Sequence, residues 1–404
     1  MPTQTAARPT IKSLIEQELP SLIALRRDLH AHPELSYQEQ RTSEVVQREL
    51  AALNIDFKPG LARGTGVLGY LPATESDGRA AVALRADMDA LPIDEKTGKP
   101  YASCTKGVMH ACGHDGHTTI LIGAARVLSK LPRPRPVAFV FQPAEEGGAG
   151  AEVMCKEGVL AGEGKGGLGA PVDTIFGLHG WPNFELNKVA SKSGPLLAAT
   201  DDFKVTVKGV GGHAAYPQFT KDPILAAAHI ITALQSIVSR NVAPLESVVC
   251  SVGAIHAGTA DNIIPDSVQF IGTIRTVSRA MRTMSRSRFY EIVESTAQAF
   301  GCKAEIFWHE GYPITSNDAA ATDRFFQIAR ATLGEDRVET VPAPTMGGED
   351  FSFYGAHAKA CFFLLGLRPK NAASYPTLHQ PDFDFNDDAL ATGIEMMCAL
   401  ATRA

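Results

Sequence analysis

The chain has 404 residues, a net charge of −6, 45% hydrophobic residues and 20% charged residues. This length exceeds what a single hydrophobic core usually supports, so two domains are expected, and the composition is that of an ordinary globular protein. Acidic and basic residues are interspersed, whereas proteins that bind nucleic acid or anionic membranes concentrate lysine and arginine, so neither partner is expected.

The chain ends and the cysteines bear on cellular location. The opening segment MPTQTAARPTIKSLIEQELP has no uninterrupted apolar stretch typical of a signal sequence, and the final residues carry no retention or lipidation signal. No window approaches the roughly 18 apolar residues of a membrane-spanning helix. The seven cysteines are scattered and odd in number, which is typical of reduced thiols. We therefore expect a cytoplasmic protein.

Helical and strand patterns alternate through most of the chain. Apolar residues recur at helical spacing over 11–32 and again over about 39–53. Apolar runs that predict buried strands follow at 79–84, 136–141, 173–178 and 360–365, and helical patterns at 117–130 and 319–333 separate several of them. Continuous Val, Ile, Leu and Phe runs alternating with helices predict an α/β fold with a mostly parallel sheet covered on both faces.

The segment between about 195 and 308 has a different pattern. An alternating strand through Phe203, Val205 and Val207 precedes a helix at 222–240. Strands near 247–256 and 266–276, a helix at 278–300 and a strand near 303–309 follow. This β-α-β-β-α-β order is the ferredoxin-like arrangement. We predict a main domain formed by 1–194 and 309–404, with 195–308 as a smaller inserted domain.

Ionisable residues follow the predicted strands of the main domain. Asp87 and Asp89 come after the first of these strands, Glu145 and Glu146 after the second, and His179 after the third. In open α/β sheets, ligands bind beyond the carboxyl ends of strands, because the loops there converge on one crevice. These side chains are therefore expected to share a site.

The segment MHACGHDGHTT (109–119) carries the strongest metal-binding pattern. Cys112 and His114 are two residues apart, a spacing that places them on different faces of a helix, whereas a loop containing Gly113 lets both face one point. Thiolate and imidazole suit zinc-like metals, and carboxylates also admit manganese, cobalt or nickel. A lone cysteine is more often a buried hydrophobe. His110 and His117 are left without an assigned role, and orienting a ligand or packing at the start of the helix is favoured for them.

Glu145 and Glu146 have two interpretations. Adjacent carboxylates are normally a solvated charge pair, but these two follow a buried strand and precede two glycines. Successive side chains in extended backbone point in opposite directions, so one carboxylate could hold a metal while the other reaches a metal-activated water. Metal-assisted hydrolysis requires that division of labour.

Several longer motifs occur in order along nearly the whole chain. They are RRDLHAHPELSYQE (26–39), RADMDALPI (85–93), HACGHDGHT (110–118), QPAEEGGAGA (142–151), GLHG (177–180), GGHAAYP (211–217), GTADNIIPD (258–266), GGEDFSFY (347–354) and HQPDFDFND (379–387). As a set they resemble the aminoacylase/carboxypeptidase family of dinuclear metallopeptidases. They are most similar to its amidohydrolase branch, which includes hippurate, N-acyl-amino-acid and auxin-conjugate hydrolases.

The resemblance implies a role for each matching position. A site for two divalent metal ions (Zn, Mn, Co or Ni) per subunit is implied, with ligands matching Cys112, His114, Glu146, His179 and His379. Glu145 matches the catalytic base. Sister branches carry His-x-Asp where this chain has Asp87-Met88-Asp89, and Asp where it has Cys112. Both departures are typical of the amidohydrolase branch, and they leave Asp89 as a group that orients a ligand.

The inserted domain matches the family's lid or dimerisation domain. His213 matches a histidine that helps to stabilise the oxyanion in the neighbouring subunit's active site, so a homodimer or higher homo-oligomer is implied. Asn262 and Arg275 match positions that hold the substrate carboxylate. Gly347 and Gly348 fall in the loop whose backbone lines the substrate cleft.

The function implied is hydrolysis of the amide bond of small N-acyl amino acids to a carboxylic acid and a free amino acid. A dipeptidase or carboxypeptidase using the same two-metal site is the alternative within the class. A cysteine enzyme with Cys112 as nucleophile and His114 as base, and a non-catalytic metal or peptide binder, are alternatives from other classes. Glu145 disfavours the binder, because a pure binding site needs no spare carboxylate beside a ligand.

Overall fold

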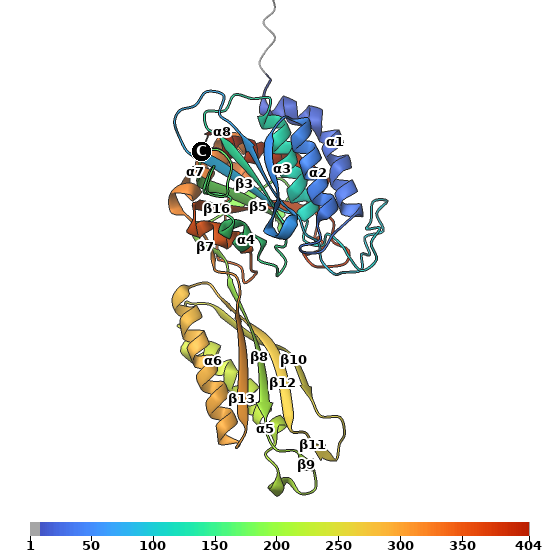
Figure 1. Ribbon diagram of the computed structural model, residues 1–404, viewed down its shortest axis with the longest axis vertical. Helices are drawn as coiled ribbons and strands as arrows, with labels where there is room; N and C mark the ends of the chain where they lie inside the picture. The colour runs from blue at the N-terminus through green and yellow to red at the C-terminus, as the bar shows by residue number, and fades with distance from the viewer. Residues whose placement is uncertain (1–8, 404) are drawn as a thin grey trace, which may run out of the picture. The chain divides into compact units, whose positions relative to one another are not determined.

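The computed structural model describes residues 9–403, which form two compact units (Figure 1). The first unit comprises the chain up to Gly194, Ser316–Pro342 and the chain from Asp350 onward, and the second comprises Pro195–Thr315 and Ala343–Glu349. The first unit is therefore discontinuous in sequence. The catalytic role of the first part and the lid role of the second are predictions from the sequence.

The first unit is built on an eight-stranded sheet in the order β1-β2-β4-β3-β5-β16-β6-β15. The strands are β1 (Asp56–Leu61), β2 (Gly66–Leu71), β3 (Ala81–Asp87), β4 (Val137–Gln142), β5 (Val172–Glu185), β6 (Val189–Ser191), β15 (Val338–Thr340) and β16 (Lys359–Arg368). The central strands β4, β3, β5 and β16 are parallel to one another, whereas the β1–β2, β2–β4 and β6–β16 pairs are antiparallel. The mostly parallel α/β sheet predicted from the sequence is confirmed.

Helices cover the sheet of the first unit. They are α1 (Ile11–Ala31), α2 (Gln40–Ala52), α3 (His114–Leu128), α4 (Gly150–Lys156), α7 (Ala319–Leu333) and α8 (Leu390–Arg403), with short turns η1 (Ala62–Gly64), η4 (Glu335–Arg337), η5 (Asp350–Ala356) and η6 (Asp387–Ala389). Helices α1, α3 and α8 pack against one another, and α4 packs against η5. Figure 1 shows α1, α2 and α3 side by side. Helix α3 is buried along almost its whole length, as expected for its apolar sequence. It begins at His114, three residues earlier than predicted.

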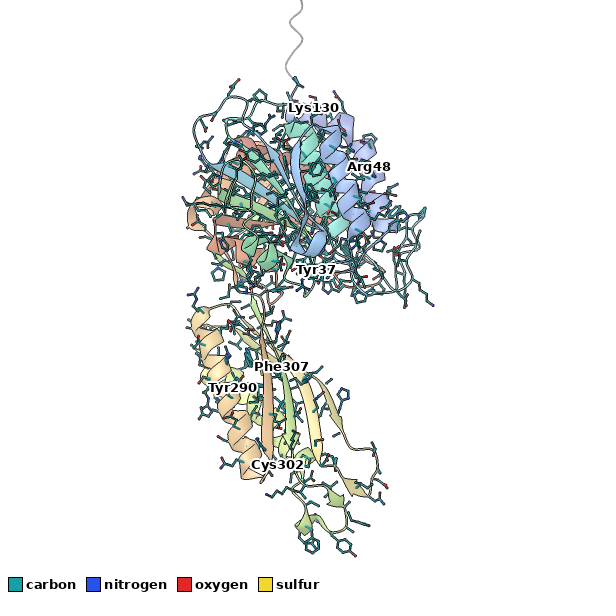
Figure 2. The ribbon with its side chains drawn as sticks, in the orientation of Figure 1. Tyr37, Arg48, Lys130, Tyr290, Cys302 and Phe307 are labelled. Carbon is teal, nitrogen blue, oxygen red and sulfur yellow. The ribbon has the colours of Figure 1, made fainter. Side chains whose placement is uncertain are left out.

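The second unit has a four-stranded antiparallel sheet in the order β10-β12-β8-β13. Its main elements are β8 (Ala199–Lys208), α5 (Pro223–Ser236), β10 (Val248–Ala257), β12 (Ser267–Thr276), α6 (Arg279–Ala299) and β13 (Lys303–Glu310). Both helices pack on one face, where Phe203, Phe270 and Phe289 form part of the core. Phe307 is exposed and lies on β13 (Figure 2). The predicted ferredoxin-like order of elements is present.

The remaining elements of the two units are short. They are β7 (Gly194–Leu197), β9 (Gly212–His213), η2 (Pro217–Phe219), η3 (Ile237–Asn241), β11 (Ile263–Ile264) and β14 (Thr315–Asn317). Among the described residues, one helical stretch, Pro223–Asn241, is long and apolar enough by length and composition to cross a membrane. The expectation that no segment reaches this limit is therefore wrong for this stretch. Its Ala226, Ile230 and Leu234 are buried in the second unit's core, which explains part of its apolar sequence, whereas Ile224 and Leu225 are exposed.

Candidate metal centre

The first unit gathers polar side chains at the carboxyl ends of its central strands. Strand β3 ends at Asp87, and β4 is followed by the left-handed residue Ala144 (φ 56°), which turns the chain into Glu145 and Glu146. His179 lies within β5, beside both β3 and β16. The topology thus brings together the segments that the sequence analysis expected to share one site.

Six candidate side chains lie close enough to share metal ions. Potential ligand atoms lie within 4.8 Å of one another in each of three overlapping groups: Cys112, His114 and His179; Cys112, Glu146 and His379; and His114, Glu145 and Glu146. The Cys112 Sγ lies 3.3 Å from His179 Nε2, and His379 Nε2 lies 3.2 Å from Glu146 Oε1. Thiol, imidazole and carboxylate donors together suit a transition-metal ion.

His114 presents one ring nitrogen to this cluster. Its Nδ1 donates to the backbone oxygen of Asp89 at 2.8 Å, whereas its buried Nε2 makes no hydrogen bond with any described residue. Burial lowers the pKa of His114, but the carboxylates of Asp87 and Asp89 outweigh it and raise the pKa to about 10. This buried nitrogen has no hydrogen bond within the described chain and lies 3.8 Å from the Oδ2 of Asp87, and such acidic surroundings fit a metal cation. A histidine that binds a metal through one ring nitrogen usually donates a hydrogen bond from the other, as the Nδ1 of His114 does here.

Cys112 is surrounded by negative charge. Burial raises the pKa of its thiol well above the ordinary value, and the carboxylates of Glu146 and Glu145 raise it further. A coordinated divalent cation would reverse this effect, because coordination deprotonates a thiol. The pairing of Cys112 as nucleophile with His114 as base is disfavoured, since the Cys112 sulfur contacts His179 instead and the Nδ1 of His114 is bonded to Asp89.

Asp89 organises the two adjacent glutamates. Its Oδ1 accepts the backbone N–H of Glu145 at 3.0 Å, and its Oδ2 accepts the N–H of Glu146 at 2.9 Å. The Ser36 hydroxyl donates to the same Oδ2 at 2.7 Å. Asp89 is buried, and although burial raises its pKa, the hydrogen bond with His114 and the other bonds lower it overall. This carboxylate therefore fixes the backbone that carries both glutamates.

Two side chains just before α2 form hydrogen bonds with the backbone of the loop that carries Glu145 and Glu146. Glu39 accepts the backbone N–H of Ala144 at 2.9 Å, and the Tyr37 hydroxyl donates to the backbone oxygen of Gly148 at 2.6 Å (Figure 2). Burial and the charge of Asp89 raise the pKa of Glu39 to about 7. The loop between β4 and α4 is thus held at both ends by side chains.

Asp87, His117 and Arg85 form a buried network beside the cluster. The Nε2 of His117 accepts the backbone N–H of Gly180 at 2.7 Å, so its proton lies on Nδ1, which donates to Asp87 at 2.6 Å. Arg85 Nη1 donates to the other oxygen of Asp87 at 2.7 Å. An arginine inside an apolar strand signals such a network. His110 is buried without a hydrogen bond to the described residues, in keeping with packing.

The second unit carries His213 and Asn262 close together. His213 is exposed on β9, which pairs with β11, and Asn262 immediately precedes β11. The backbone oxygen of Asn262 accepts the N–H of Ala214 at 3.0 Å. These two predicted residues therefore share one end of the second unit.

Arg275 and the two predicted glycines form a separate group in that unit. Arg275 is half-buried on β12, and its Nε donates to Thr273 Oγ1 at 3.0 Å. A Cβ placed on Gly348 would lie 3.2 Å from Arg275 Nη1, so Gly348 lies beside the guanidinium group. The backbone oxygen of Gly347 accepts the N–H of Ala198.

Comparison with known proteins places the chain in a family. The sequence pattern of the peptidase family M20/M25/M40 matches residues 83–403. The chain belongs to this family. As a member of the M20/M25/M40 family, the protein is a metal-dependent hydrolase that acts on amide bonds.

Relatives within the family match nearly the whole chain. The N-acetyl-L-cysteine deacetylase of Bacillus subtilis is 41% identical over 387 residues, which are 95% of this chain and 87% of the relative. The IAA-amino acid hydrolase ILR1-like 4 of Arabidopsis thaliana is 40% identical over 390 residues, covering 95% and 85%. A solved dinuclear metal binding peptidase of the M20 family from Bacillus subtilis matches with a TM-score of 0.81 and 34% identity, covering 96% and 98%.

Proposed function

We propose that the protein hydrolyses N-acyl amino acids and binds two divalent metal ions per chain. The proposed ligands are Cys112, His114, Glu146, His179 and His379. The main support for this proposal is the overlap of two ligand groups. Both contain Cys112, and one also contains His179 whereas the other contains His379. The deacetylase and IAA-amino acid hydrolase relatives support the choice of an N-acyl amino acid as substrate.

Glu145 is the proposed general base, and Glu146 is the proposed ligand. Bound metal ions would polarise the substrate carbonyl and lower the pKa of a water molecule. Glu145 takes the proton of that water and delivers it to the departing amine. Because Asp89 fixes the backbone of both glutamates, their carboxylates keep distinct positions.

The second unit supplies the remaining proposed groups. His213 donates to the oxyanion, in the active site of a second copy of the chain. Asn262 and Arg275 hold the substrate carboxylate, for which guanidinium geometry is well suited. The backbone of Gly347 and Gly348 lines the cleft.

The proposed partner is a second copy bound to the second unit. Strand β10 is an edge strand of its sheet, with an unpaired row of backbone groups. Exposed apolar side chains lie on this strand and on α5, among them Ile255, Ile224 and Leu225. An apolar face beside an open strand edge suits a closed homodimer, in which both copies use the same surface.

Measurement of mass in solution tests the second copy. The wild-type chain is expected to be at least dimeric, and Leu225→Asp is expected to produce monomers. The matched control is Phe307→Asp, which changes another exposed apolar residue of the same unit and should leave the assembly intact. A fully active wild-type monomer would contradict the proposal.

Zinc, manganese, cobalt or nickel suits the proposed donor set. The cytoplasm is the proposed location, because all seven cysteines, which lie among the described residues, are outside disulfides, as is typical of a reducing compartment.

A matched pair of substitutions tests the proposed division between the glutamates. Glu145→Gln should abolish hydrolysis of an N-acetyl or N-benzoyl amino acid while the metal content stays at two ions per chain. Glu146→Gln should lower the metal content itself. An active Glu145→Gln protein would remove the proposed base.

The second candidate function is that of a dipeptidase or carboxypeptidase, which the name of the solved M20 peptidase favours. Parallel assays with an N-acetyl amino acid and a free dipeptide separate the two. Faster release of amino acid from the dipeptide would favour the peptidase.

A further inference from the structure

A completely buried arginine on α1 lies outside the machinery of the proposed function. Arg26 Nε donates to Asp387 Oδ1 at 2.7 Å, and its Nη1 donates to Asp384 Oδ1 at 2.8 Å. The same Nη1 lies 3.3 Å from Asp115 Oδ2. One side chain thus contacts three carboxylates, which come from two segments far apart in the sequence.

Both of these segments carry proposed metal ligands. Asp115 directly follows His114 in the first turn of α3. Asp384 follows His379 in the loop that leads to η6, and Asp387 is the first residue of η6. Arg26 therefore connects the segment of one ligand with the segment of another.

The two segments also contact each other along their lengths. The backbone N–H of His379 donates to the oxygen of Ala111 at 2.8 Å. Farther along, Phe385 packs so closely on Gly116 that a Cβ there would lie 2.5 Å from its ring. Between these contacts, Asp384 points to Arg26 while the neighbouring Phe385 points to α3, as alternation in extended backbone allows.

His379 depends on this backbone for its position. Its side chain is 52% exposed, so packing fixes it only in part, and its backbone is left-handed at φ 64°. Asp384 is held further by the Tyr101 hydroxyl, which donates to its Oδ2 at 2.7 Å. The guanidinium group offers several fixed N–H directions, whereas a lysine ammonium at the same place would act as a point charge.

We propose that Arg26 is a positioning residue that holds the His379 segment against the His114 segment, so that both histidines meet the same pair of metal ions. This role rests on the proposed function, in which both are ligands. Substitutions of groups that orient a ligand typically weaken metal binding by about 10–100-fold. A loss of metal affinity of that size is expected for Arg26→Lys, because lysine keeps the positive charge but lacks the planar set of N–H donors of the guanidinium group.

The test is Zn²⁺ affinity of the full chain, measured by competition with a chromophoric chelator after metal removal. In Arg26→Lys, the affinity for the more weakly bound of the two proposed Zn²⁺ ions should be at least about 10-fold lower than in the wild type. The matched control is Arg126→Lys, because Arg126 joins α3 to Glu18 on α1 and Glu49 on α2 without contacting the His379 segment. That variant should keep wild-type affinity. Should Arg26→Lys not fold, Asp387→Asn removes one contact of the arginine instead.

A double-mutant cycle separates positioning from general loss of structure. In a His379→Ala background, the effect of Arg26→Lys on Zn²⁺ affinity should disappear, whereas a general structural effect would persist. Persistence of the effect, or an unchanged affinity in Arg26→Lys while His379→Ala weakens binding, would overturn the positioning role alone. Unchanged Zn²⁺ affinity in His379→Ala would instead overturn the ligand role of His379 in the proposed function.

Discussion

Asp89→Asn changes a single charge at the point where the two glutamates are held. Asparagine has nearly the same shape, so packing is preserved. It has only one acceptor oxygen, whereas Asp89 uses one oxygen for the N–H of Glu145 and the other for the N–H of Glu146. Whichever way the amide is oriented, one buried backbone N–H faces an NH₂ group and loses its acceptor.

The expected cost follows from these contacts. A hydrogen bond to a charged group contributes about 1.5–3 kcal/mol, and a buried donor left unpaired costs about 1–3 kcal/mol. A loss of about 3 kcal/mol at the glutamate loop corresponds to a factor of about 100, since each 1.36 kcal/mol is tenfold. We therefore expect kcat/KM to fall by about 100-fold and Zn²⁺ affinity by about 10–100-fold.

The assay combines Zn²⁺ competition with the rate of hydrolysis of an N-acetyl amino acid at saturating metal. Asp318→Asn is the matched control, because Asp318 also accepts a backbone N–H, that of Ala321 at 2.9 Å, but at the start of α7. It should lose some stability and keep its metal affinity. An Asp89→Asn protein within threefold of the wild type in both measurements would refute the reasoning.

Three further predictions concern other parts of the molecule. His213→Ala should lower kcat by about 10²–10³, as expected for loss of an oxyanion donor, with unchanged metal content; a near-normal rate contradicts that role. Burial lowers the pKa of His30, but neighbouring carboxylates raise it from 6.5 to about 9, so its contribution is complete below pH 6.5 and is lost as pH rises through 9. Urea unfolding of the metal-free protein should show a free energy of unfolding that falls over that pH window. His30→Gln should make this decline smaller. Identical pH profiles for the two proteins would contradict this role of His30. Gly116→Ala should destabilise the fold by about 1–3 kcal/mol, because its Cβ would meet the Phe385 ring at 2.5 Å, whereas Gly355→Ala, with its nearest contact at 3.8 Å, should be neutral in the same unfolding assay.

The central strands and the inserted unit were predictable because their patterns are strong. The continuous apolar run of β16 predicts a strand buried on both faces, and the alternating sequence of β8 predicts a strand buried on one face. Strand β1 was not predictable, since its sequence DFKPGL contains proline and glycine and is mostly exposed at the sheet edge. The early start of α3 was also missed, because Gly113 looks like a loop residue and is instead the left-handed N-cap of the helix.

The candidate site was predictable in its donor types but not in its connections. Cys112 and His114 are close in sequence, and motif resemblance supplied His379 from far along the chain. The partners of Asp87 and Arg26 could not be read from spacing. Asp87 interacts with His117, 30 residues away, and Arg26 contacts Asp384 at a separation of 358. Such pairings depend on how the strands and helices pack, which local sequence does not encode.

The number of metal ions needed for hydrolysis tests the central claim most directly. Chelator-treated protein would be titrated with Zn²⁺, with native mass spectrometry counting ions per chain and an N-acetyl amino acid reporting activity. Two ions per chain are predicted, with no hydrolysis by the metal-free protein and full activity only when the second ion is bound. Hydrolysis without metal, or saturation of activity at one ion per chain, would contradict the account.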